Sequence, residues 1–223
     1  MRNVELYKEH HSKHPSYGKS FDVHYPYIGA IVYYLGCKSL IDYGCGKNLL
    51  VDKFREAGVE GAVKYDPAIP GIDKLPDQVF DCLINTDVLE HIPEDDLPAV
   101  LETFKRLSST AIIIPHLGKA KAILPNGENA HCTIKTPSEW RSLFERYYKH
   151  VEQLPHHSEI HAAFLCSDLD LNYKAIYNLT DICCYLRTRY TIKQFVKTKS
   201  FGKRARMAIK ILRGEHAFSK KAL

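Results

Sequence analysis

The sequence predicts a three-layer α/β sandwich built around a mostly parallel β-sheet. Short, almost continuous apolar runs alternate with segments of helical spacing, as expected of strands buried on both faces and covered by helices. Two glycines directly follow the first run, which is typical of the turn from a parallel strand into a helix. The 223 residues are 45% hydrophobic, enough for one domain with a sizeable core and an appendage.

The apolar runs predict six strands, each bounded by turn residues or a polar segment. They lie at residues 39–43, 62–65, 79–85, 111–114, 151–154 and 162–166. Between them, residues 48–57 present an apolar face and end at Gly58, which favours a helix with a glycine stop. Pro93 and the acids after it favour a second helix, which runs to Leu107, and Pro137 opens a third.

The two ends of the chain differ from this regular middle part. Residues 1–34 are rich in Tyr and His and show neither a helical nor an alternating apolar pattern. They could fold over a ligand as a lid, with residues 17–20 in contact with it, or form a surface helix. We therefore divide the chain into an N-terminal segment 1–34, a core 35–168 and a C-terminal extension 169–223.

The C-terminal extension carries most of the positive charge. The net charge is +5, and residues 186–223 hold twelve of the 31 Lys and Arg residues but one of the 26 Asp and Glu residues. Residues 203–213 predict a basic amphipathic helix. It could bind an anionic partner, which would be RNA, an acidic carrier or a membrane surface, or it could dock by its apolar stripe.

The sequence lacks the features of a membrane protein and of a disulfide-rich or zinc-binding protein. No apolar run approaches the ~20 residues that a membrane span needs, and the first residues do not resemble a signal peptide. We therefore expect no transmembrane segment and a cytoplasmic location. The seven cysteines include no Cys-x-x-Cys pair, which argues against a disulfide framework and a zinc knuckle.

The turn after the first strand indicates the ligand. It runs from Asp42 to Asn48 and lacks both the third glycine of a dinucleotide fingerprint and the Ser or Thr of a P-loop. Asp66 follows the second strand, where an acid can accept hydrogen bonds from ribose hydroxyls. Asp42 suits a cationic amino group. Together these features favour a nucleoside with a cationic amino-acid arm, namely S-adenosylmethionine.

Three segments, in order, resemble motifs of the class I S-adenosylmethionine-dependent methyltransferases. Residues 40–46 resemble the first motif, residues 65–66 the ribose-binding acid, and residues 80–92 the fourth-strand motif with its Val-Leu-Glu-His run. The resemblance implies a Rossmann-like fold with a seven-stranded sheet, whose third strand is unclear between Asp66 and Phe80. Asn48 stands where the family often has a third glycine, and Asn tolerates such a turn.

The same resemblance implies the cofactor-binding residues. They are Asp42, Gly44, Cys45, Gly46, Asp66, Pro67, Asp73, Asn85 and Thr86. Within this set, Asp66 would bind the ribose and Asp73 the adenine amino group.

Three histidines are candidates for a catalytic base: His91, His116 and His131. Each follows a strand on the ligand-binding side, and imidazole titrates near neutral pH. Glu128 beside His131 could orient a base or hold a metal. No second acidic ligand is evident, so we expect no metal.

The favoured function is S-adenosylmethionine-dependent methyl transfer to an oxygen of a small molecule or sugar (glycan), because a hydroxyl acceptor benefits from a base. Two alternatives stay open. One is an RNA methyltransferase that uses the basic tail, and the other is a non-catalytic, cofactor-binding partner subunit.

Overall fold

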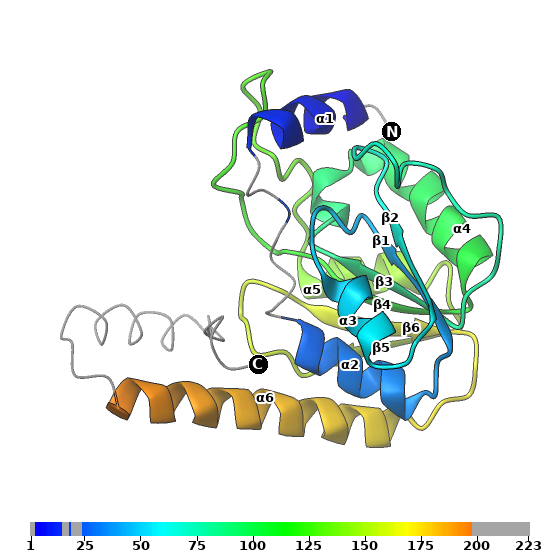
Figure 1. Cartoon of the computed structure of the whole chain (residues 1–223), viewed down its shortest axis with the longest axis vertical. Coiled ribbons are helices and arrows are strands. Elements are labelled where there is room, and N and C mark those ends of the chain that lie inside the picture. The colour runs from blue at the N-terminus through cyan, green and yellow to red at the C-terminus, as the bar shows by residue number, and fades with distance from the viewer. Residues whose placement is uncertain (1–2, 15–17, 19–23, 198–223) are drawn as a thin grey trace.

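A computed structural model of the chain describes residues 3–14, residue 18 and residues 24–197, with side chains up to Arg187. Within these residues, six strands form one sheet in the spatial order β2-β1-β3-β4-β6-β5 (Figure 1). The strands are β1 (Ser39–Tyr43), β2 (Gly61–Tyr65), β3 (Cys82–Thr86), β4 (Thr110–Ile114), β5 (His150–Leu154) and β6 (Ala163–Ser167). The first four strands pair in parallel, and β6 runs antiparallel to β4 and β5. The predicted α/β class with a mostly parallel sheet is confirmed.

The expected count of seven strands was wrong for the described part of the chain, because the stretch between β2 and β3 contains no strand. This stretch closes on itself through turns, in which the Asp66 amide donates to the Ile72 carbonyl at 3.0 Å. Its three prolines, Pro67, Pro70 and Pro76, have no N–H to donate to a neighbouring strand. The sheet therefore ends at β2 on that edge.

Helices cover both faces of the sheet and complete the three layers. One face carries α2 (Tyr25–Tyr34), α3 (Leu50–Glu56) and α6 (Tyr173–Lys197), and the other carries α4 (Leu97–Leu107) and α5 (Pro137–Phe144). The remaining helical elements are α1 (Val4–Lys13), η1 (Leu89–His91) and η2 (Glu94–Asp96). Successive strand residues point to opposite faces, so that Leu40 belongs to one buried cluster and Ile41 to the other.

The N-terminal segment contains two helices, α1 and α2, although its sequence shows no helical pattern. In α2, Tyr27, Ile28 and Ile31 are buried in the core, and the helix also contacts α6. A helix that is covered on more than one side needs no polar stripe, so its sequence carries no amphipathic period. In Figure 1, α1 lies at the top of the molecule and α6 runs along its lower edge.

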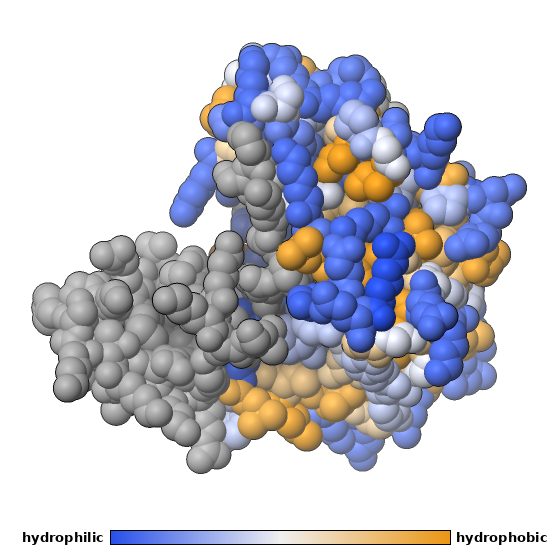
Figure 2. Space-filling view, in the orientation of Figure 1, coloured by the Kyte–Doolittle hydropathy of each residue, from blue (hydrophilic) through white to orange (hydrophobic). Residues whose placement is uncertain are grey.

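The C-terminal extension is described only through α6. The predicted basic helix at residues 203–213 lies outside the described residues. Apolar side chains, including Ile182 and Leu186, are exposed along α6, where Figure 2 shows hydrophobic surface at the lower edge. Among the described helices, none has the length and apolar character that crossing a membrane requires.

Candidate active site

A cavity of about 1020 Å³ opens at the carboxyl ends of the parallel strands. This volume is at the upper end of the roughly 300–1,000 Å³ range of small-molecule sites, so it has room for a cofactor and a second ligand. Its lining comes from α1 and Gly18, from the glycine turn after β1, and from the loops after β2, β3 and β4. The ligand-binding end of the sheet thus lies where parallel α/β topology predicts it.

Gly44 and Gly46 shape one side of this cavity through their backbone conformation. Both have a positive φ, 78° at Gly44 and 56° at Gly46, which side chains disfavour. A Cβ at Gly44 would lie 2.5 Å from a methyl carbon of Val88, and one at Gly46 would lie 2.8 Å from the Gly18 carbonyl oxygen. The turn is therefore a cradle that only glycine fits.

Asp66 joins the glycine turn to the end of β2. Its carboxylate accepts hydrogen bonds from the Gly46 amide at 2.9 Å and the Ala68 amide at 2.8 Å. Asp66 is 7% exposed and lines the cavity together with Pro67. Each carboxylate oxygen keeps lone pairs that can accept further hydrogen bonds, so these residues fit a ligand with vicinal hydroxyls.

Five of the predicted cofactor-binding residues lie outside the cavity lining. Asp42 is 1% exposed and accepts a hydrogen bond from the Asn48 amide group at 3.2 Å, and Asn85 donates to the Tyr43 carbonyl at 2.9 Å. Burial, followed by the nearby charge of Asp66, raises the pKa of Asp42 to about 7. The other three are the buried Cys45, the half-buried Thr86 and the exposed Asp73, which accepts from the Gly71 amide. The buried members support the strands beneath the cavity.

His91, at the end of η1, lines another part of the cavity, which we call its histidine side. Its Nδ1 atom lies 2.8 Å from the Ala130 carbonyl oxygen and 2.9 Å from the Tyr7 hydroxyl. Because a carbonyl can only accept, Nδ1 carries the proton and Nε2 keeps its lone pair. Burial lowers the pKa of His91 to about 4, so the ring is neutral at ordinary pH.

His116 and His131, from the polypeptide after β4, meet His91 in the same cavity. The ring centre of His131 lies 4.7 Å from those of His91 and His116. His131 Nδ1 donates to the Gly118 carbonyl, which leaves Nε2 as an acceptor. His116 Nδ1 lies 2.9 Å from the Gly118 amide nitrogen, from which it can accept, and 3.0 Å from the Gly118 carbonyl oxygen, to which it can donate. Burial lowers the pKa of both rings. The structure therefore brings together the three histidines singled out from the sequence.

The carboxylate beside His131 is Glu90 and not Glu128. Glu128 is exposed and accepts a hydrogen bond from Asn126 at 2.9 Å, whereas Glu90 Oε1 lies 3.9 Å from His131 Nε2. Glu90 is fully buried, and neither oxygen makes a hydrogen bond within the described residues. Burial, and then the charge of Asp87, raises its pKa, so this carboxyl group can hold a proton.

Several cavity residues were missed from the sequence. Tyr7, His24, Asp87 and His161 all line it, although none of them was among the predicted site residues. Asp87 carried a usable signal, since it opens the Asp-Val-Leu-Glu-His run after β3. The others come from segments far apart in the chain, and only the fold places them side by side.

Comparisons with known proteins concern the family and the fold of the chain. Residues 36–171 match a family described as a methyltransferase domain. No curated protein matches the chain. Two solved structures have a TM-score of 0.50. The methyltransferase domain of bacterial CtHen1-C is 17% identical, and the match covers 66% of this chain and 98% of that one. The Burkholderia thailandensis 1,6-didemethyltoxoflavin-N1-methyltransferase, solved with S-adenosylhomocysteine, is 13% identical, with 75% and 90% covered.

A third structure, magnesium protoporphyrin IX methyltransferase from Synechocystis with bound S-adenosylmethionine, is 16% identical with a TM-score of 0.40, covering 64% of this chain and 77% of that one. At these identities, the likeness to the two structures with a TM-score of 0.50 shows the fold alone.

Proposed function

Because the chain belongs to the class I S-adenosylmethionine-dependent methyltransferases, we propose that it transfers a methyl group to an oxygen of a small molecule or sugar. When bound, S-adenosylmethionine supplies an activated methyl group whose bond to sulfur breaks as the acceptor oxygen bonds to the carbon. The observation that carries the proposal is the two-sided cavity, with a glycine turn and Asp66 on one side and three neutral imidazoles on the other.

The cofactor side consists of Gly44, Gly46, Asp66 and Pro67. The glycine turn lets a ligand approach the backbone closely, and Asp66 accepts hydrogen bonds from the ribose hydroxyls. The predicted residues beneath the cavity would hold the glycine turn and the end of β3 in place without contacting the cofactor. They are Asp42, Cys45, Asn85 and Thr86. Asp73 remains the proposed contact for the adenine amino group on the loop after β2.

His131 is our proposed base. Its Nδ1 proton is fixed on the Gly118 carbonyl, so the Nε2 lone pair is available to take the proton from an acceptor hydroxyl. Glu90 Oε1 lies 3.9 Å from Nε2. Burial raises the pKa of Glu90, but an imidazolium formed at this distance would favour the charged carboxylate, which would in turn stabilise the imidazolium. His91 is a weaker base because burial lowers its pKa to about 4. His116 Nδ1 contacts both the amide and the carbonyl of Gly118, so no single acceptor fixes its proton as the Gly118 carbonyl does for His131. Those two rings are better suited to contact the acceptor.

The N-terminal segment is our proposed lid. Tyr7 of α1 donates a hydrogen bond to the Ala130 carbonyl at 2.7 Å, which fixes the helix against the histidine side. The other end of α1 is tied to the glycine turn, since Lys47 Nζ donates to the His11 carbonyl at 2.8 Å. The Lys47 amide also donates to the Gly18 carbonyl at 2.8 Å. Such a cover excludes water from the reacting groups.

The test is transfer of labelled methyl groups into fractionated metabolites, glycans and RNA, compared between the wild type and His131→Asn. Loss of a general base lowers kcat by about 10²–10⁴-fold, while affinity for S-adenosylhomocysteine stays unchanged. The rate of the variant should rise steadily with pH, because the acceptor must then ionise by itself. His150→Ala is the matched control, since His150 lies on β5, bonds Asp170 and does not line the cavity.

Three results would count against the proposal. They are full activity in His131→Asn, transfer to RNA alone, and binding of S-adenosylhomocysteine without turnover on any acceptor fraction. The last result would favour a cofactor-binding partner subunit.

A further inference from the structure

A second group of ligating side chains lies in the cavity, beside the three histidines already described. It consists of His24 at the start of α2, Asp87 after β3 and His161 before β6. His161 Nε2 lies 2.9 Å from Asp87 Oδ1, and His24 Nε2 lies 3.6 Å from Asp87 Oδ2. One ligating atom from each residue lies within 4.8 Å of the others. Tetrahedral ligands at ~2.1 Å from an ion are about 3.4 Å apart, so this spacing suits one metal ion.

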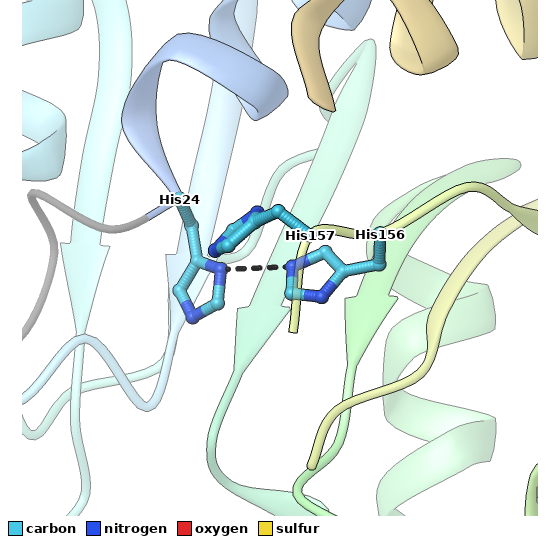
Figure 3. Close-up of side chains that lie close together, drawn as sticks. All are labelled: His24, His156 and His157. Atoms are coloured by element: carbon cyan, nitrogen blue, oxygen red, sulfur yellow. Dashed lines mark hydrogen bonds between the residues drawn. The ribbon is translucent and has the colours of Figure 1, made fainter. Parts of the chain in front are cut away.

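Neighbouring groups orient both rings toward Asp87. His161 Nδ1 lies 2.9 Å from the Ser158 hydroxyl, and His24 Nδ1 lies 3.4 Å from His156 Nε2. Figure 3 shows the His24 and His156 rings turned toward each other, with His157 beside them. Without an ion, each Nε2 can donate a proton to the Asp87 carboxylate. An ion bound there would displace these protons, and the contacts to Ser158 and His156 would then hold a proton on each Nδ1. Such contacts to the outer nitrogen are typical of metal-ligating histidines.

Asp87 has a left-handed backbone conformation, which is uncommon outside glycine although Asp adopts it more readily than most residues. Its φ is 54°, the one positive value among the described non-glycine residues, and its amide donates to the Ile114 carbonyl at 3.0 Å. A strained backbone of this kind is kept where it places a side chain for function. The Asp87 side chain is 30% exposed and lines the cavity, so a ligand can reach it.

We propose that His24, Asp87 and His161 bind one divalent transition-metal ion of the zinc type, with its remaining coordination positions open to the cavity. Two imidazoles and a carboxylate are a donor set that such ions prefer. The adjacent group of His24, His156 and His157 is less suitable, because it has no carboxylate. In the proposed function, this ion would bind an oxygen of the acceptor, and that role rests on the proposed function. The metal site itself does not depend on it.

The test is calorimetric titration of the full chain with Zn²⁺ after removal of metal by a chelator, supported by the visible spectrum with Co²⁺. We expect one strong site per chain, weakened at least about 100-fold in His24→Ala and His161→Ala, since loss of a ligand should exceed the roughly 10–100-fold cost of losing an outer partner. Asp87→Asn is the more conservative variant, because Asn tolerates a positive φ and keeps the shape of Asp. His150→Ala is the control and should retain full affinity.

His156→Ala tests the orienting role separately. If His156 is a positioning residue, this substitution should weaken metal affinity by about 10–100-fold. The Co²⁺ spectrum of the saturated site should still indicate the same set of ligands. Binding of S-adenosylhomocysteine, measured on every variant, reports whether the fold is intact.

The outcomes separate the two proposals. Absence of a strong Zn²⁺ site in the wild type, or unchanged affinity in both His24→Ala and Asp87→Asn, overturns the metal site. So does a site that depends on Glu90 or His91 and not on His24. Metal binding without S-adenosylhomocysteine binding would instead refute the proposed function and leave the metal site standing.

Discussion

The two sides of the cavity are built in different ways. The glycine side comes from a few neighbouring residues of β1 and β2, and its shape depends on backbone conformation at Gly44 and Gly46. The histidine side collects side chains from α2, from η1 and from the loops after β3, β4 and β5. A site made of backbone tolerates almost no added atom, whereas a site made of side chains can change its chemistry one residue at a time. This division suits the proposed function, in which the glycine side binds the cofactor and the histidine side binds the acceptor.

The largest expected effect concerns the glycine side. Gly44→Ala places a Cβ 2.5 Å from Val88, and alanine is also disfavoured at the positive φ of this position. We therefore expect the free energy of unfolding to fall by about 2–4 kcal/mol. Gly58→Ala is the matched control, since Gly58 has a φ of 93° and open space around it. It should lose only about 1–2 kcal/mol. Urea denaturation measures both, and equal losses would show that the cradle is not tight.

The same division explains how much could be predicted from the sequence. The glycine turn and the inner strands were legible because each depends on consecutive residues, such as the apolar run of β4. The helices α2 and α6 were not, since α2 is covered on more than one side and α6 exposes apolar residues such as Ile182. The convergence of His91, His116 and His131 followed from strand order. The grouping of His24 with His161 did not, because packing alone joins α2 to the loop before β6.

The second effect concerns cofactor affinity. Asp66→Ala should weaken binding of S-adenosylhomocysteine by about 1–3 kcal/mol, because hydrogen bonds to a charged carboxylate are lost. Asp73→Ala should weaken it less, by about 0.5–1.5 kcal/mol, because the proposed bond from Asp73 to the adenine amino group forms at an exposed position outside the cavity lining. Calorimetry on both variants decides the matter. A larger loss at Asp73 than at Asp66 would place the adenosine differently from our proposal.

The two sides also differ in how protons affect stability. Burial raises the pKa of Asp42 to about 7, so the folded state holds a proton that the unfolded state releases, and stability falls as pH rises from about 4 to about 7. Burial lowers the pKa of His91 to about 4, so the unfolded state takes up the proton first. The contribution of neutral His91 to the free energy of unfolding is therefore lost as pH falls from about 6.5 to about 4.

The smallest expected effect follows from these opposite signs. His91→Gln removes one acid-sensitive group, so its unfolding free energy should fall by about 1–2 kcal/mol less than that of the wild type between about pH 7.5 and pH 5. Asp42→Asn should act in the other direction. Between about pH 4 and about pH 8, the free energy of unfolding of this variant should fall less than that of the wild type. Denaturant titrations across this range test both. If His91→Gln keeps the wild-type slope on acidification, His91 is not the neutral, buried ring described above, and the histidine side must owe its acid sensitivity to other groups.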